Sequence, residues 1–224
     1  MKYINLHTHN KQESECETSI LNLFPADADN FIKKHNRRFC SIGLHPWHID
    51  KSTAFSLIEN IEIQAKNHNI LAIGEIGLDR KCDVEFKLQE EILKKQLEIA
   101  EKLNKPVIWH VVKSYSEVLS LKKNLGPAVP WILHNFHAKA QITLSLANQG
   151  FYFSFGAMLM NEKSKNADIL QLIPINNLFF ENDTSEIPIE NVYKKASDIL
   201  SLPNEKLKQI TNENFLRIFG KRNE

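Results

Sequence analysis

The sequence is poor in the residues that interrupt or cross-link a chain. Only 7 glycines and 8 prolines occur among 224 residues, which argues against disordered or low-complexity segments. Cys16, Cys40 and Cys82 are odd in number and lack the spacing of a zinc finger. Their pattern excludes a disulfide framework and predicts a reducing compartment.

The sequence also lacks an excess of either charge and any long apolar run. A formal net charge of +1 provides no broad basic face for long nucleic acids, although a local phosphate site stays open. No apolar run reaches the ~20 residues that cross a bilayer. The N-terminus has no basic region followed by an apolar one, as a signal peptide would. We therefore expect a cytoplasmic protein that makes no membrane contact, and we favour a monomer.

What is present is a series of short apolar runs that alternate with amphipathic segments. Helical periodicity is clearest over residues 85–103 and is repeated over 140–148 and 204–219. The apolar runs are typical of buried parallel strands. They cover residues 3–7, 19–23, 39–43, 70–75, 107–110, 131–134, 151–155 and 178–182. This order predicts an α/β fold, a TIM (β/α)8 barrel forming a single domain over residues 1–224. A doubly wound open sheet is the alternative.

Polar residues stand at the carboxyl ends of these runs, where the active sites of such barrels lie. His7 and His9 are two apart on a strand, so both side chains point to the same side and could grip one ion. The other members of this set are His45, Glu75, His110, His134 and Asp183. Each one alone could be a packed histidine, a turn or a helix cap. Imidazole and carboxylate together bind divalent metals, and six of these seven residues, four histidines with Glu75 and Asp183, suit two ions bridged by a carboxylate.

The ordered motifs resemble the TatD-like metal-dependent hydrolases, the TatD deoxyribonuclease family. Five motifs carry the resemblance, namely His7-Thr8-His9, Gly43-Leu44-His45-Pro46, Gly74-Glu75-Ile76-Gly77-Leu78-Asp79, Pro106-Val107-Ile108-Trp109-His110 and Glu181-Asn182-Asp183. Leu133-His134-Asn135-Phe136 and the C-terminal stretch 210–220 add to it. The match spans nearly the whole chain, and the ordered set is more specific than any one motif.

The resemblance implies an amidohydrolase-like barrel that holds two divalent ions, Zn²⁺, Mn²⁺ or Mg²⁺. His7, His9 and Asp183 would hold the first ion, His110 and His134 the second, and Glu75 would bridge them. Asp183 and Glu75 would be catalytic, with Asp183 orienting or deprotonating the attacking metal-bound water. His45 would contact the substrate phosphate. The family is described as deoxyribonucleases, so DNA or a nucleotide-like phosphodiester would be the substrate.

The chain departs from the family pattern at the predicted substrate rim. Asn5 replaces a usual aspartate, and Lys113 is the cation nearest to the position of a missing arginine. Lysine lacks the forked geometry that binds phosphate in a bidentate way. His137 replaces a serine, and the loop after Asp183 is short. We predict Lys113 and His137 as substrate contacts. Hydrolysis of an amide or ester without phosphorus, and a metal-stabilised binding protein without turnover, are the alternatives.

Three tryptophans follow or occupy the predicted strands. Trp47, Trp109 and Trp131 could each stack on a base, but packing within the barrel is the favoured interpretation.

Overall fold

The computed structural model describes residues 1–12 and 14–220. Backbone contacts divide the chain into two compact units. The central unit is Ile20–Ile132, and the terminal unit is Met1–Ser19 together with Leu133–Glu224. That the whole chain forms one domain stays a prediction. Among the helices of the described ranges, none combines the length and apolar character needed to cross a membrane.

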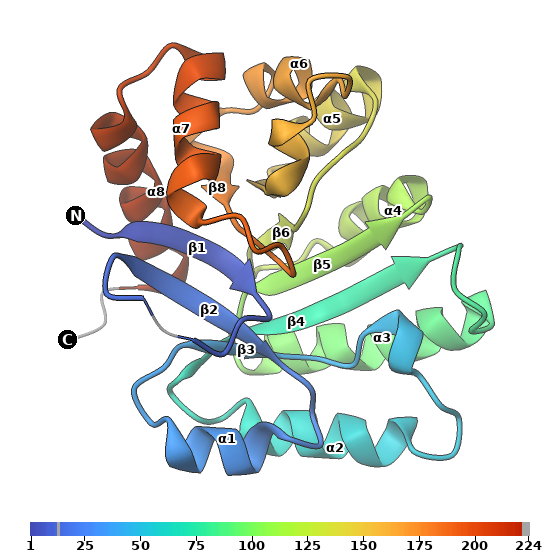
Figure 1. Ribbon diagram of the computed structural model, residues 1–224. Coiled ribbons are helices and arrows are strands. Elements are labelled where there is room, and N and C mark those ends of the chain that lie inside the picture. The colour runs from blue at the N-terminus through green and yellow to red at the C-terminus, as the bar shows by residue number, and fades with distance from the viewer. Residues whose placement is uncertain (13, 221–224) are drawn as a thin grey trace. The chain divides into compact units, whose positions relative to one another are not determined.

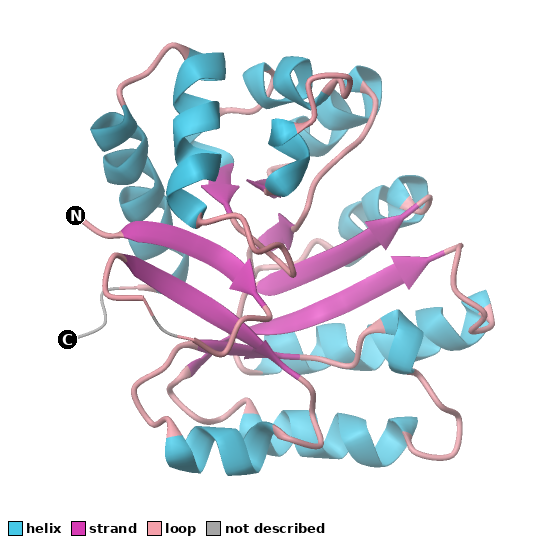
Figure 2. Cartoon of the chain, viewed as in Figure 1, coloured by secondary structure: helices cyan, strands magenta, loops and turns pink. Residues whose placement is uncertain are grey.

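The central unit alternates strands with helices. Its strands pair in parallel and in chain order, as a barrel requires, and β4 and β5 run side by side in the same direction (Figure 2). The elements are β2 (Glu17–Leu23), α1 (Ala28–Lys34), β3 (Cys40–Ile42), the 3₁₀ turn η1 (Pro46–His48), α2 (Ala54–Gln64), β4 (Ile70–Asp79), α3 (Phe86–Lys102), β5 (Val107–Val112), α4 (Tyr115–Leu125) and β6 (Trp131–Leu133).

Helix α3 holds the carboxyl end of β4 and the segment that follows β3, and it lies alongside β4 (Figure 1). Its buried face carries two glutamines among aliphatic residues. The Gln96 amide accepts a hydrogen bond from the Leu44 nitrogen at 2.7 Å and donates to the Leu44 carbonyl oxygen at 3.1 Å. Gln89 makes the same pair of bonds with Asp79, at 2.8 and 3.0 Å. Each buried amide therefore satisfies one backbone donor and one backbone acceptor, those of Leu44 beyond β3 and of Asp79 at the end of β4.

The terminal unit contains both ends of the described chain. Strands β7 and β8 are parallel, and Thr8 at the end of β1 forms a parallel bridge with Asp183 beyond β8. The elements are β1 (Tyr3–Thr8), α5 (Ala140–Asn148), β7 (Tyr152–Phe155), the 3₁₀ turn η2 (Ala157–Met160), α6 (Asn166–Gln171), the 3₁₀ turn η3 (Ile175–Asn177), β8 (Leu178–Phe180), α7 (Ile189–Leu200) and α8 (Asn204–Phe219). Asn214 of α8 donates to the carbonyl oxygens of Ile175 and Leu178, which joins this helix to the start of β8.

All eight predicted strands are present, and the three predicted helices lie within one residue of the expected bounds. The carboxyl ends of three strands differ from the predicted bounds by two residues or more. Strand β5 continues two residues beyond His110 to Val112, where it still pairs with β4. Strand β4 continues four residues beyond Glu75 to Asp79, because this stretch keeps pairing with β5. Strand β8 ends at Phe180, two residues early, because the chain turns there to place Asp183 against β1.

Candidate metal centre

The central unit brings three predicted site residues into one cluster, His45, Glu75 and His110. One ligand atom of each lies within 4.8 Å of the others. The Glu75 Oε1 atom is 2.8 Å from Nδ1 of His110 and 3.2 Å from Nε2 of His45. Two imidazoles and a buried carboxylate form a donor set that suits a divalent transition metal. His45, predicted as a phosphate contact, thus stands among the potential ligands of this central cluster.

Local irregularity of β4 places Glu75. The pairing of β4 with β5 shifts register between Ile73 and Ile76, which is how a strand redirects a side chain. The Glu75 backbone nitrogen donates to Oδ1 of Asn22 on β2 at 2.8 Å instead of joining the ladder. Gly77 permits close contact with β5, since a Cβ atom there would lie 1.8 Å from the His110 carbonyl oxygen. Glu75 and His110 are held together by this contact between strands.

Asp79 holds the other side of the His110 ring. Its Oδ2 atom is 3.0 Å from Nε2 of His110 and accepts a 2.6 Å hydrogen bond from the Trp47 indole nitrogen. Burial alone would raise the pKa of Asp79, but hydrogen bonds from His110, Trp47 and the Lys81 backbone lower it below its ordinary value. An ionised Asp79 accepts a hydrogen bond from a protonated Nε2, which leaves the unprotonated Nδ1 directed at Glu75. Carboxylates commonly orient metal-binding histidines in this way.

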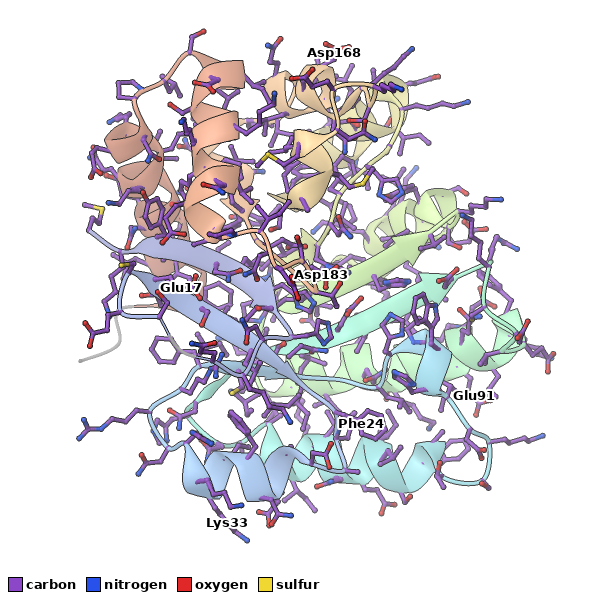
Figure 3. The ribbon with its side chains drawn as sticks, in the orientation of Figure 1. Glu17, Phe24, Lys33, Glu91, Asp168 and Asp183 are labelled. Carbon is purple, nitrogen blue, oxygen red and sulfur yellow. The ribbon has the colours of Figure 1, made fainter. Side chains whose placement is uncertain are left out.

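The terminal unit gathers a second cluster around Asp183. Ligand atoms of His7, His134 and Asp183 lie within 4.8 Å of one another. The Asp183 Oδ1 atom is 3.7 Å from Nε2 of His7 and 3.6 Å from Nε2 of His9. The backbone sets this geometry, because the Asp183 nitrogen donates to the His7 carbonyl oxygen at 3.1 Å and the His9 nitrogen donates to that of Asp183 at 3.0 Å. Asp183 accordingly lies beyond β8 at the end of β1 (Figure 3).

Two further side chains support this terminal cluster. Glu181 is fully buried, and its Oε1 atom is 3.1 Å from Nδ1 of His134, so Nε2 remains for an ion. Burial would raise the pKa of Glu181, but the charges of His134 and His7 and the bond to His134 lower it instead. Asn135 donates its side-chain amide to Oδ2 of Asp183 at 3.3 Å. The left-handed backbone of Asn135 and Asp183, with φ of 41° and 52°, suits their residue types.

The substitution at position 5 has a partner within the terminal unit. The Asn5 amide donates to Oδ1 of Asn182 at 3.0 Å, and its Oδ1 accepts from the Asn182 backbone nitrogen at 3.2 Å. Asparagine can both donate and accept here, whereas an ionised aspartate could only accept. The pair holds the backbone between Glu181 and Asp183 against β1.

The other two predicted substrate contacts, Lys113 and His137, lie outside these clusters, and their role stays a prediction. Lys113 is exposed one residue after β5, with φ of 54°. His137 is exposed, with Nδ1 at 3.1 Å from the Asn135 carbonyl oxygen. Sequence reasoning did not assign Asp79, Glu181 or Asn135. All three belong to the motifs that carry the family resemblance, each in the same motif as a predicted ligand. That shared motif could have indicated that they support the site.

Comparison with known proteins identifies the family. A model of the family described as TatD related DNase matches residues 21–220. The chain belongs to this family of metal-dependent hydrolases. An uncharacterized metal-dependent hydrolase, YabD of Bacillus subtilis, is 26% identical over 208 residues, covering 86% of this chain and 81% of YabD.

Two solved structures establish the fold. The TatD homologue YjjV of Escherichia coli superposes with a TM-score of 0.85 at 18% identity and covers 98% of both chains. A TatD family hydrolase of Entamoeba histolytica gives 0.80 at 16% identity, covering 97% of this chain and 98% of its own. The TatD chain is therefore a TIM (β/α)8 barrel, as predicted, and not a doubly wound sheet.

Proposed function

We propose that this TatD protein hydrolyses phosphodiester bonds in DNA or a nucleotide-like substrate with the aid of two divalent ions, one at each cluster. The observation that carries the proposal is that His45, Glu75 and His110 in one unit, and His7, His134 and Asp183 in the other, each bring three metal-binding donors together. The family description as a DNase supports phosphodiesters over other substrates. Mixed imidazole and carboxylate donors favour Zn²⁺ or Mn²⁺, and Mg²⁺ fits less well because it prefers oxygen ligands.

Bound divalent ions would lower the pKa of a water molecule and stabilise the negative charge that develops on the phosphate. The chain's own residues perform the remaining tasks. In the central cluster, Glu75, His45 and His110 would be ligands, while Asp79 keeps the proton of His110 on Nε2. A ligand locked in this way needs no reorganisation when the substrate binds.

In the terminal cluster, Asp183 would accept the proton of the attacking water. Its Oδ1 atom faces His7 and His9, and its Oδ2 atom accepts from Asn135. Two backbone hydrogen bonds, one to His7 and one from His9, hold Asp183, so its carboxylate is fixed relative to those histidines. His134, oriented by Glu181, would complete the ligand set.

Lys113 and His137 would contact substrate phosphates, because both side chains are exposed, with Lys113 directly after β5 and His137 in the segment that follows β6. Lys113 would act as a point charge, which predicts weaker discrimination of phosphate geometry than an arginine would give. The cytoplasmic location and the monomeric state stay predictions.

The test is hydrolysis of bis(4-nitrophenyl) phosphate and of an end-labelled single-stranded oligodeoxynucleotide by protein loaded with Zn²⁺, Mn²⁺ or Mg²⁺. Asp183→Asn and Glu75→Gln should each lower kcat at least ~100-fold, the usual contribution of a positioned acid-base group. Glu205→Gln, an exposed carboxylate in the first turn of α8, is the matched control and should retain activity.

Two results would refute the proposal. Turnover of an ester, lactone or amide panel without any phosphodiester cleavage would assign the site to non-phosphorus substrates. Absence of all turnover, with a lower Tm in Asp183→Asn and Glu75→Gln, would indicate a metal-stabilised binding protein.

A further inference from the structure

Trp47 is an exposed aromatic ring beside the central cluster, which corrects the expectation that all three tryptophans pack inside the barrel. Trp109 and Trp131 do pack there, with 0% and 1% exposure, whereas 61% of Trp47 is exposed. An indole left in water gives up the free energy that burial provides. Trp47 lies in the 3₁₀ turn η1 after β3. Pro46 is the buried residue of this turn, and Trp47 lies outside the core.

The exposed ring is nevertheless held in one position. Its indole nitrogen donates to the buried carboxylate of Asp79 at 2.6 Å, and its backbone nitrogen donates to Nδ1 of His45 at 3.1 Å. The ring centroid lies 5.0 Å from that of His45 and 5.8 Å from that of His110, both in edge-to-face geometry. A ring fixed before binding loses little conformational entropy when a ligand packs on it.

Trp47 belongs to a row of rings within the central unit. The ring centroid of His48 lies 5.8 Å from that of His45 and 5.6 Å from that of Phe24. Phe24 directly follows β2 and is 37% exposed (Figure 3). Exposed cations follow the two neighbouring strands, Lys113 after β5 and Arg80 after β4, the latter ion-paired with Glu117. Aromatic rings combined with positive charge are how proteins bind single-stranded nucleic acids, through stacking and phosphate contacts.

We propose that Trp47 is a stacking platform for a nucleobase of the substrate, adjacent to a phosphate at the His45, Glu75 and His110 cluster. This inference rests on the proposed function, because it names the part of the substrate that lies next to the scissile phosphate. The base would then contribute affinity without sequence preference, since every base offers a planar face.

The first experiment measures binding by fluorescence. Trp47 is the exposed member of three tryptophans, so a base stacked on it should quench the emission. Metal-loaded protein is titrated with thymidine 5′-phosphate and, separately, with 2-deoxyribose 5-phosphate, which lacks a base. We expect quenching by the nucleotide alone. Trp47→Ala should weaken nucleotide binding at least about fivefold, measured by calorimetry, and leave binding of the sugar phosphate unchanged.

Two control variants separate stacking from support of the site. Trp47→Phe keeps a ring but loses the hydrogen bond to Asp79, so it should retain most of the nucleotide affinity. Phe55→Ala removes another exposed aromatic, 43% exposed on α2, and should change neither affinity. Equal loss of nucleotide and sugar phosphate binding in Trp47→Ala would overturn the proposal, since Trp47 would then act only through Asp79.

The second experiment compares cleavage of a single-stranded oligodeoxynucleotide with that of the same strand carrying abasic sites. Trp47→Ala should raise KM for the normal strand and not for the abasic one. Equal KM values for both strands in the unmodified protein would overturn the stacking platform while phosphodiester hydrolysis still stands. Base-dependent quenching without cleavage of either strand would support the platform and refute the proposed hydrolysis.

Discussion

Tyr193 shows how one side chain joins a helix to a strand in the terminal unit. This α7 residue is fully buried, and its hydroxyl donates to the Ile4 carbonyl oxygen at 3.0 Å and accepts from the Ile4 nitrogen at 3.1 Å. The hydroxyl also lies 2.7 Å from Oγ1 of Thr211 on α8. Burial raises the pKa of Tyr193 well above its usual range, so the group remains a neutral donor. The Tyr193 hydroxyl therefore anchors β1, which carries His7 and is followed directly by His9.

Tyr193→Phe should lower the free energy of unfolding by about 1–3 kcal/mol, because it leaves buried backbone groups of Ile4 without this partner. Urea denaturation measures the loss. Tyr152→Phe, which removes a partly exposed hydroxyl from β7, is the control and should cost less than ~0.5 kcal/mol. Equal losses in both variants would show that the Tyr193 hydroxyl contributes nothing specific.

At this scale the sequence predicted the members of the two clusters better than the residues that support them. His7, His110, His134 and Asp183 could be named because chemistry-bearing residues at successive strand ends form a pattern along the chain. Asp79 could not, because its role depends on which side of the His110 ring it reaches. Exposure of Trp47 was likewise not predictable, since it follows from the direction of the η1 turn.

At the scale of elements, β4 is the segment on which the central cluster depends. All ten of its residues are buried, and α3 covers it while β3 and β5 flank it. The apolar run predicted a strand ending at Glu75, because glycine at positions 74 and 77 is typical of turns. The structure uses Gly77 for close strand contact instead. A propensity argument cannot distinguish these uses, since only the neighbouring strand decides between them.

Gly77→Ala should destabilise the protein by about 3 kcal/mol or more, because the added Cβ would overlap the His110 carbonyl oxygen and force β4 from β5. Thermal unfolding gives the stability. Gly150→Ala serves as the control, since a Cβ there meets nothing within 4 Å and only its φ of 71° opposes alanine, at a cost of about 1–2 kcal/mol. Similar losses in the two variants would refute the role of close strand contact.

At the scale of the whole molecule, the two clusters would couple metal binding to stability. Each cluster places carboxylates among imidazoles, and its members come from strand ends far apart in the sequence. An unfolded chain cannot assemble such a set, so an ion binds the folded state preferentially. Metal at 100 times its dissociation constant would add about 2.7 kcal/mol to the free energy of unfolding.

Chelation with EDTA should therefore lower the Tm by about 5–10 °C for each ion removed, the shift that this free energy gives in a chain of this size, and Zn²⁺ or Mn²⁺ should restore it. Elemental analysis should find two ions per chain. His134→Ala and His110→Ala should each retain one, because they remove a donor from different units. His68→Ala, an exposed histidine outside both clusters, should retain two. If every variant keeps two ions and chelation leaves the Tm unchanged, these clusters are not the metal sites.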